Sequence, residues 1–207
     1  VPVTHTFPGA GVYCVKYCVA GPLPNPTNCT GNCDTKVVTV PIQAAFNYTL
    51  GCNGCLTISN TSTVITPNPS FVTYSWNFGD GSPVNTSANP PVHCYATSGN
   101  YPVTLTINYN DGQVSCQSTV THNVNYTKLD INMGTACTGQ QIAMTSTPGN
   151  YVSYAWNFGD GFSAYTASTV HVYNTAGPYT VTLTVVDQLG NTCIATKNIT
   201  VKQGVTG

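Results

Sequence analysis

The side chains that could do chemistry in this chain are few and are spread singly along it. All six acidic residues are Asp, and there are four His but no Arg or Glu among the 207 residues. Asp80 and Asp160 lie in Gly-Asp-Gly sequences, and Asp111 and Asp187 lie in sequences typical of tight turns, where Asp bonds its own backbone. Paired carboxylates for glycoside hydrolysis would have to come from two separate turns. The sequence also lacks nucleophile-elbow, zinc-protease and phosphate-loop motifs, so we expect neither an enzyme nor a bound cofactor.

The ten cysteines could serve as metal ligands or as disulfide partners. Cys52-x-x-Cys55 with His93-Cys94 offers ligand types that zinc accepts, and so do the four cysteines before residue 40. These spacings are loose for a zinc site. An even number of cysteines in a chain with two Met and little charge indicates an oxidising, exterior environment. We therefore expect disulfides at these positions.

The composition excludes several classes of partner. Only 5% of the residues are charged, against about 25% in an average soluble protein. The net charge of −1 provides no basic patch for nucleic acid or anionic lipid. No apolar run approaches the roughly 18 residues of a membrane span, and no signal peptide is visible. We expect an extracellular or cell-surface protein that binds no nucleic acid and does not span a membrane.

The elements that must position these side chains belong to an internal repeat. The hexapeptide Trp-Asn-Phe-Gly-Asp-Gly occurs at 76–81 and again at 156–161, 80 residues later. Its Trp and Phe, with the Tyr two residues before the Trp, alternate with polar residues and therefore face one side of a strand. Each copy is followed by His-x-Tyr and by a run, 101–107 or 179–185, in which Tyr, Val and Leu alternate with Thr. That period predicts half-buried strands, and no stretch has the period of an amphipathic helix.

This combination resembles the PKD domain (polycystic kidney disease repeat), a small β-sandwich of immunoglobulin type. The family signature is Trp-x-Phe-Gly-Asp-Gly, then His-x-Tyr, then Gly-x-Tyr-x-Val-x-Leu, and both copies match it throughout. The resemblance implies an all-β fold of tandem immunoglobulin-like sandwiches at 41–127 and 128–207, stapled by disulfides. It also implies structural roles for the motif residues, which are Trp76, Phe78, Asp80, His93, Trp156, Phe158, Asp160 and His171. Some PKD-like modules bind calcium, but the single Asp residues here do not cluster as a calcium site requires.

Residues 1–40 hold an incomplete β unit with the closing strands of a PKD-like domain only. In an antiparallel hairpin we expect Cys18 to face Cys29 and Cys14 to face Cys33, which would give two cross-strand disulfides. The alternate positions share an apolar face that is a candidate for assembly: Tyr13, Val15, Tyr17 and Val19. Forty residues cannot bury an adequate core alone. The missing half would lie before Val1 or would be supplied by another subunit, and the second arrangement gives an open filament.

The positions of the other six cysteines in the repeat suggest how they pair. Cys52 in the first complete unit and Cys137 in the second each lie ahead of the Trp strand. Cys116 and Cys193 each lie in the last strand of the same units. Two cysteines of the first unit then remain for each other. The predicted pairs are Cys52–Cys116, Cys137–Cys193 and Cys55–Cys94.

Six Asn-x-Ser/Thr sequons are candidate N-glycosylation sites, although a chain so rich in Asn, Thr and Ser would produce several by composition. They begin at Asn28, Asn47, Asn60, Asn85, Asn125 and Asn198.

Two functions fit these observations. The first is a non-catalytic structural or adhesive module of an extracellular surface protein that self-associates into a homopolymeric fibre, with a glycan or surface as a further partner. PKD domains commonly act as spacers and interaction modules, and this chain lacks the charges that normally protect sheet edges. The alternative is an accessory segment of a secreted hydrolase that binds polysaccharide or protein. The alternative requires a catalytic domain outside these residues and an aromatic strip on one outer face.

Overall fold

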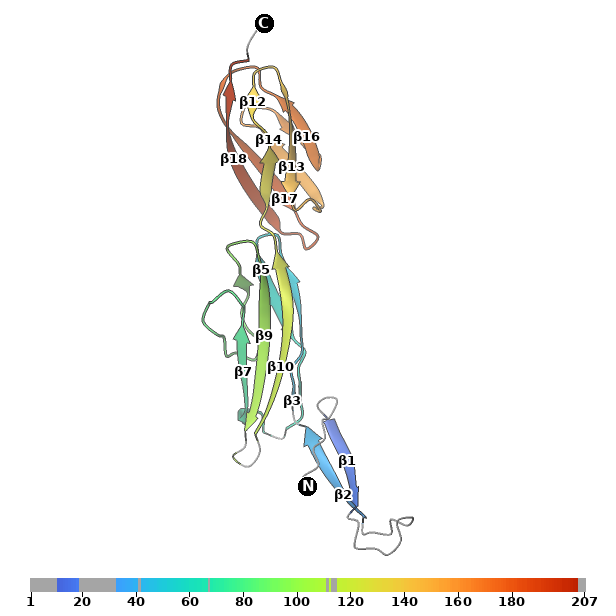
Figure 1. The fold of residues 1–207 in the computed structure, drawn as a ribbon. Helices are drawn as coiled ribbons and strands as arrows, with labels where there is room; N and C mark the ends of the chain where they lie inside the picture. The colour runs from blue at the N-terminus through green and yellow to red at the C-terminus, as the bar shows by residue number, and fades with distance from the viewer. Residues whose placement is uncertain are drawn as a thin grey trace, which may run out of the picture. The chain divides into compact units, whose positions relative to one another are not determined.

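The fold is described from a computed structural model of the chain. The structure describes residues 11–18, 33–40, 42–66, 68–110, 112 and 115–204, and for the first two ranges it describes the backbone alone. These residues form β-strands and connecting turns, with one short 3-10 helix, η1 (Pro69–Phe71), as the only helical element in the described ranges (Figure 1). The all-β fold predicted from the alternation of apolar and polar residues is confirmed.

The chain divides into two compact units, and their boundary cuts through the first repeat. The first unit contains residues 1–47, 59–90 and 102–122, and the second contains 48–58, 91–101 and 123–207. Four strands therefore contribute residues to both units: β4 (Phe46–Leu50), β5 (Cys55–Asn60), β9 (Gly99–Asn110) and β10 (Ser115–Tyr126). The sequence boundaries at 41 and 128 follow the repeats and stay a prediction.

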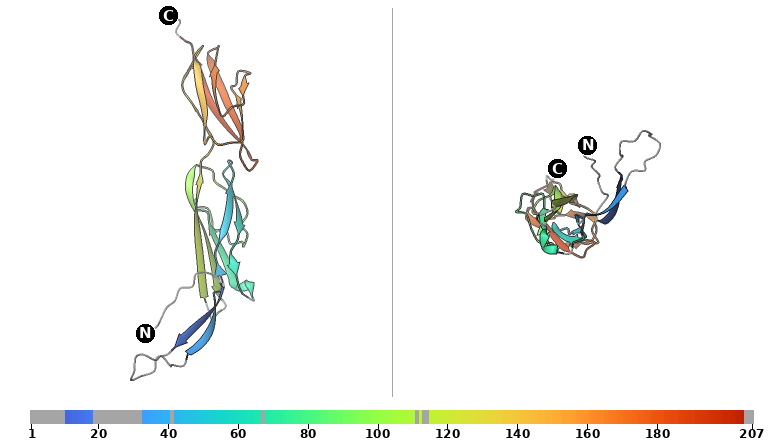
Figure 2. Two further views of the ribbon diagram at one scale, coloured as in Figure 1. Left: turned by 90° about the vertical axis from the view of Figure 1, so that its right-hand side faces the viewer. Right: turned by 90° about the horizontal axis from the view of Figure 1, so that it is seen from below.

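The N-terminal hairpin consists of β1 (Gly11–Cys18) and β2 (Cys33–Val40), which lie side by side in each view (Figures 1 and 2). Its register places Cys18 opposite Cys33 and Cys14 opposite Val37. The predicted facing of Cys18 with Cys29 and of Cys14 with Cys33 is therefore wrong. The register of a hairpin depends on the length of its connection, and here the connection takes all residues between Cys18 and Cys33. Cys29, Val19 and every side chain of the hairpin lie outside the described residues, and so do the two predicted bonds and the predicted assembly face.

The first compact unit is built around a three-stranded sheet of order β10-β9-β7, where β7 is Val72–Asn77. Trp76 lies opposite Leu105 in the antiparallel pairing of β7 with β9, and both side chains are fully buried. Phe46 packs edge-on against Trp76, with 5.2 Å between the ring centroids. Two short strands, β3 (Ile42–Gln43) and β6 (Thr63–Val64), pair separately. The aromatic side chains of the repeat motif thus form the core, as their alternation predicted.

The second compact unit contains the complete second repeat. One sheet has the order β12-β18-β17-β14-β15 and another has the order β11-β13-β16. A third, β4-β5-β8, contributes residues 48–50 of β4, residues 55–58 of β5 and the whole of β8 to this unit. The bounds of the strands not given above are β8 (His93–Cys94), β11 (Asp130–Met133), β12 (Ala136–Cys137), β13 (Gln141–Thr147), β14 (Ser153–Asn157), β15 (Ser163–Ala164), β16 (Ser168–Val172), β17 (Gly177–Val186) and β18 (Thr192–Lys202).

The core of the second repeat fills the space between the inward faces of its two larger sheets. Trp156 is 1% exposed, and its indole Nε1 donates to the carbonyl of Thr166 at 2.9 Å. Around it pack inward residues of β13, β14, β17 and β18, among them Met144, Leu183 and Val201. A buried tryptophan with its one polar atom satisfied makes a large contribution to the stability of such a sandwich.

The Gly-Asp-Gly turn of the second repeat requires glycine at its first position. Gly159 has φ of +82°, and a Cβ there would lie 2.7 Å from the carbonyl oxygen of Thr180. The Asn157 side chain accepts a hydrogen bond from the Gly159 amide at 2.9 Å and ends β14 with a tight Asx turn. This turn fixes where the following Asp160 carboxylate lies.

Candidate functional site

Asp160 and His171 form a close pair of ionisable side chains. Asp160 Oδ2 and His171 Nε2 lie 2.6 Å apart, and the two side chains are only 15% and 11% exposed. The other carboxylate oxygen of Asp160 accepts the Phe162 amide at 3.2 Å, so both oxygens are engaged. The pair ties the Gly-Asp-Gly turn to β16.

Aromatic rings surround this pair. The His171 ring stacks on Phe158 with 4.0 Å between centroids and 6° between planes, and it meets Tyr173 edge-on at 4.6 Å. The Tyr173 hydroxyl donates to the Phe158 carbonyl at 2.9 Å. Burial, with the nearby Asp160 and Tyr179, raises the pKa of Tyr173 to about 12. A histidine enclosed in this way positions the turn and offers no open face to a substrate, which agrees with the structural role that the repeat implies.

The corresponding residues of the first repeat have related local contacts. Asp80 Oδ1 accepts the Ser82 amide at 3.0 Å. The ring of His93 meets Tyr95 edge-on at 5.0 Å, and Tyr95 stacks on Tyr101 with 3.8 Å between centroids. The two copies of the motif therefore share turn chemistry and aromatic packing.

Two disulfides are present among the described cysteines, Cys55–Cys94 and Cys52–Cys193. The first was predicted, and its cysteines are direct partners in the register of β5 with β8. The second replaces two predicted bonds, Cys52–Cys116 and Cys137–Cys193, which are both wrong. Cys116 and Cys137 are half-buried free thiols.

The lengths of the last strands explain these errors. Cys116 lies near the start of β10, ten residues or roughly 33 Å of extended chain from Tyr126, which is the residue that closely approaches the Gly51–Gly54 turn. Cys137 lies opposite Lys202 in the parallel pairing of β12 with β18, nine residues or roughly 30 Å along β18 from Cys193. In both repeats, the cysteine ahead of the Trp strand and the cysteine in the last strand are therefore too far apart to form a disulfide.

The described residues contain no cluster of three or more His, Cys, Asp or Glu that could hold a metal ion. The sequence alternative of zinc at Cys52, Cys55 and Cys94 does not apply, because all three cysteines are in disulfides. The hydrogen bonds of the Asp160 and Asp187 carboxylates run to protein groups.

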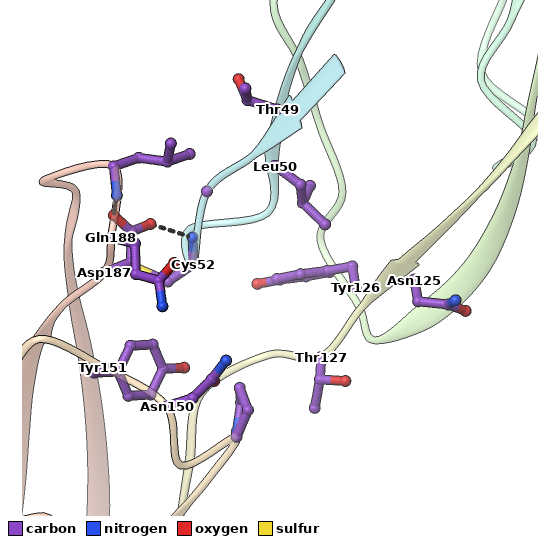
Figure 3. Close-up of a pocket in the computed structure, with 13 residues that line it drawn as sticks. Thr49, Leu50, Cys52, Asn125, Tyr126, Thr127, Asn150, Tyr151, Asp187 and Gln188 are labelled. Atoms are coloured by element: carbon purple, nitrogen blue, oxygen red, sulfur yellow. Dashed lines mark hydrogen bonds between the residues drawn. The ribbon is translucent and has the colours of Figure 1, made fainter. Parts of the chain in front are cut away.

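A cavity of about 480 Å³ lies in the second compact unit beside the Cys52–Cys193 bond (Figure 3). Its walls come from the β4–β5 turn, the end of β10, the segment around Tyr151 and the turn at Asp187. Asp187 accepts hydrogen bonds from the backbone amides of Cys52, Leu189 and Asn191, at 2.9, 2.9 and 2.8 Å, and from the Asn191 side chain at 3.0 Å.

These hydrogen bonds favour the ionised form of the Asp187 carboxylate. Partial burial acts to raise its pKa, but the hydrogen bonds from Cys52, Asn191 and Leu189 together outweigh burial and hold the pKa below its usual value. The sequence predicted a turn residue here and gave no sign of the cavity. Its walls come from segments up to 140 residues apart, Thr49 to Leu189, so that no local pattern marks it.

The comparison with protein families agrees with the geometry of the repeats. The profile of the PKD domain matches residues 38–124 and 127–202. The chain belongs to the PKD domain family. Both hexapeptides, both buried tryptophans and both Asp turns lie within the matched residues.

Relatives that carry PKD domains include human polycystin-1, which is 33% identical over 123 residues, or 56% of this chain and 3% of polycystin-1. Collagenase ColA of Bacillus cereus is 47% identical over 58 residues, or 28% of this chain and 6% of the collagenase. The crystal structure of the PKD1 domain from Vibrio cholerae metalloprotease PrtV is 31% identical, with a TM-score of 0.32, and covers 36% of this chain and 94% of that domain. This chain thus spans a few per cent of the length of the curated relatives. PKD domains of this kind occur in extracellular proteins, including secreted proteases, as generally non-catalytic modules.

The predicted glycosylation sites of the PKD repeats lie in different surroundings. Asn47, Asn125 and Asn198 are exposed. Asn60 donates its side-chain amide to Ala88, and the side-chain oxygens of Asn85 and Asn198 accept from Ser87 and Thr180. Asn28 lies outside the described residues. Glycosylation at each of these sites stays a prediction.

Within the described ranges, no helix has the length and apolar character needed to cross a membrane.

Proposed function

We propose that this chain is a non-catalytic structural and adhesive module of an extracellular surface protein, which associates with copies of itself into a fibre through contacts between β-domains. The observation that carries the proposal is a neutral sheet face in the first compact unit. The face consists of the outward side chains of β7, β9 and β10, and we call it the polar face: Thr73, Ser75, Asn77, Thr104, Thr106, Asn108, Gln117, Thr119 and Thr121.

The polar face is ordered by hydrogen bonds between its own side chains. Thr104 bonds Thr121 at 2.9 Å, Thr106 bonds Thr119 at 3.2 Å, and Gln117 donates to Asn108 at 2.8 Å. The edges of sheets usually carry Lys, Glu or inward charges that discourage association, and only 5% of the residues of this chain are charged. The polar face contains no ionisable side chain, so that a second sheet can approach it without separating charges from water.

The hairpin supports the same proposal. Within the described residues, β1 and β2 form a sheet of two strands. A hairpin of two strands is marginally stable in water without a packing partner. Strands of a second copy would complete it by β-strand addition, and head-to-tail contacts of that kind do not close.

The test is electron microscopy and sedimentation of the purified full chain over a range of concentrations. We expect fibres for the natural sequence. The double variant Thr106→Lys with Thr119→Lys places two like charges opposite each other on the polar face and should abolish the fibres. The control, Gln140→Lys with Thr175→Lys, adds the same charge at exposed turn positions and should leave them unchanged. Monomers of the natural sequence at every concentration would refute the proposal.

A second candidate function is an accessory segment of a hydrolase. It is favoured by the names of two relatives, a collagenase and a metalloprotease, which share PKD domains with this chain. Specific retention of the chain on an insoluble polysaccharide or on collagen, without fibre formation, would support this second function.

A further inference from the structure

The disulfide Cys52–Cys193 joins a cysteine of the first PKD repeat to a cysteine of the second. Cys52 comes from the turn between β4 and β5, and Cys193 lies in β18, the last strand of the second repeat; both residues belong to the second compact unit. Each repeat also holds one free thiol, Cys116 in the first and Cys137 in the second. The contacts proposed for the polar face use neither thiol, so these two cysteines need an explanation of their own.

Cys137 occupies in the second repeat the place that Cys52 occupies in the first. Each of the two cysteines lies two residues before a glycine of positive φ, which is +80° at Gly54 and +77° at Gly139. Each of these glycines forms a backbone hydrogen bond with the Tyr of the His-x-Tyr motif in its own repeat, at 2.9 Å and 3.0 Å. The two turns are therefore equivalent, and Cys137 is the free counterpart of the bonded Cys52.

Cys116 occupies in the first repeat the place that Cys193 occupies in the second. Both are the second residue of the last strand of their repeat, β10 or β18. Both also lie on the inward side of that strand: Cys193 is buried, and Cys116 shares its side of β10 with the buried Val124 and Tyr126, because side chains two residues apart point the same way. Cys116 is therefore the free counterpart of Cys193.

The two free thiols are accessible to a partner outside their own repeat. Both are half-buried, whereas the bonded Cys193 is only 7% exposed. Cys137 borders a hollow of about 600 Å³ whose other walls come from residues 133–136 and the end of β18. Within each repeat, strand length separates the free thiol from the other predicted cysteine by roughly 30 Å or more. In an extracellular protein, cysteines that internal pairing leaves over point to bonds between molecules.

We propose that Cys137 of one copy of this chain forms a disulfide with Cys116 of a second copy and thereby repeats the Cys52–Cys193 linkage between molecules. The two thiols lie in different compact units, so the contact joins two different surfaces. A linked pair of copies keeps one free Cys116 and one free Cys137, so that further copies can be added in the same way. The proposal rests on the proposed function only in that copies must meet, and it adds a covalent bond that depends on redox conditions.

The linkage is an oxidation, and a small-molecule disulfide such as oxidised glutathione serves as the oxidant. The thiolate of one cysteine attacks a glutathione sulfur, which releases one glutathione and leaves a mixed disulfide on the protein. The thiolate of the second copy then attacks the protein sulfur of this mixed disulfide, forms the bond between the copies and releases the second glutathione. Two protein thiols are oxidised, one glutathione disulfide is reduced to two thiols, and the two protein protons end on the released glutathione.

The test incubates the full chain with oxidised glutathione over a range of protein concentrations, followed by denaturing electrophoresis without reductant. We expect a ladder of dimers, trimers and larger species that grows with protein concentration and collapses to one band when a reductant is added. Peptide mapping of the dimer band should recover Cys116 linked to Cys137. The double variant Cys116→Ser with Cys137→Ser retains the other eight cysteines and should give no ladder.

Mixing two single variants tests whether the contact joins unlike cysteines. Cys116→Ser and Cys137→Ser should each remain single chains under oxidation. Their mixture should form dimers and nothing larger, because each variant then offers one thiol of the required pair. Each variant should unfold at the same temperature as the unlinked natural chain, because its missing thiol is free within one chain. Dimers in the mixture would also show that both variants are folded.

Four results would overturn the proposal. These are the absence of a ladder from the natural chain, a ladder from the double variant, dimers formed by either single variant alone, and a bond from Cys116 to a cysteine of its own chain. Fibres of the natural chain without a ladder would overturn the cross-link and leave the proposed function standing. A ladder from a chain that forms no fibres in the microscope would support the cross-link and refute the fibre, so the two failures are distinguishable.

Discussion

Cys52 and Cys193 form a disulfide between residues 141 positions apart in the sequence, with 6.2 Å between their Cα atoms. The Cys52 amide also donates to Asp187, a few residues before Cys193, at 2.9 Å. A covalent bond and a charge-assisted hydrogen bond thus hold the β4–β5 turn against the turn between β17 and β18. The cavity lined by Tyr126 and Tyr151 lies beside this contact.

Replacement of both Cys52 and Cys193 by Ser should lower the free energy of unfolding by about 4–5 kcal/mol in the chain-entropy model, because the bond closes a long loop. Denaturant unfolding measures the loss. Cys116→Ser, which alters a free thiol, is the control and should have little effect. Peptide mapping without reduction should recover Cys52 linked to Cys193, and recovery of Cys52 linked to Cys116 would contradict the structure.

Asp160→Asn should destabilise the chain by about 1–3 kcal/mol, because His171 would lose a short bond to a carboxylate in a site with little water. Asn retains a side-chain oxygen that can accept the hydrogen bond from the Phe162 amide. The substitution therefore changes only the bond with His171. Thermal unfolding is the measurement. Asp130→Asn serves for comparison, because the Asp130 side chain is 65% exposed and its Oδ2 lies 3.9 Å from Lys197 Nζ. The loss of stability in this variant should be close to zero. Equal effects of the two variants would argue against a structural role for the pair.

Trp156→Ala should cost about 3–5 kcal/mol, since it removes the largest side chain from the core of the second repeat and leaves the Thr166 carbonyl without its donor. Chemical denaturation of the variant provides the value. Tyr165→Ala removes a large aromatic ring from an exposed position and should change stability by less than about 0.5 kcal/mol. An unchanged midpoint for Trp156→Ala would mean that the tryptophan is not part of the core.

The stability of the chain should fall as the pH rises from 10 to 12. Burial raises the pKa of Tyr151 and of Tyr173 from 10.0 to about 12 in the folded chain. The unfolded chain releases these protons near pH 10, so the folded state binds more protons in this interval and loses its advantage as pH increases. Absorbance at the tyrosinate band should show late-ionising tyrosines, and Tyr173→Phe should remove one of them. Complete ionisation of all tyrosines near pH 10 without unfolding would contradict this prediction.

The sequence by itself determined the elements and their inward faces. Tyr, Trp and Phe alternate with polar residues before each Gly-Asp-Gly, and a strand has a period of two residues, so Trp76 and Trp156 could be assigned to the core without coordinates. Gly159 and Asp160 could be assigned to a tight turn for an equally local reason, since turn geometry depends on a few neighbouring residues. The Cys55–Cys94 bond was also predicted, but by elimination after Cys52 had been paired with Cys116, and that premise was wrong.

Only the tertiary structure decided which distant residues meet. Cys52 bonds Cys193 and not Cys116, because β10 carries Cys116 roughly 33 Å along the strand from the end where Cys52 lies. The hairpin register of Cys18 with Cys33 depends on how many residues the connection takes, which alternation does not specify. The bond between Asp160 and His171 joins a turn to β16, and the cavity around Tyr151 lies where separate turns approach each other. Such contacts depend on strand lengths and sheet pairing together, and these are properties of the folded chain and not of any local stretch of sequence.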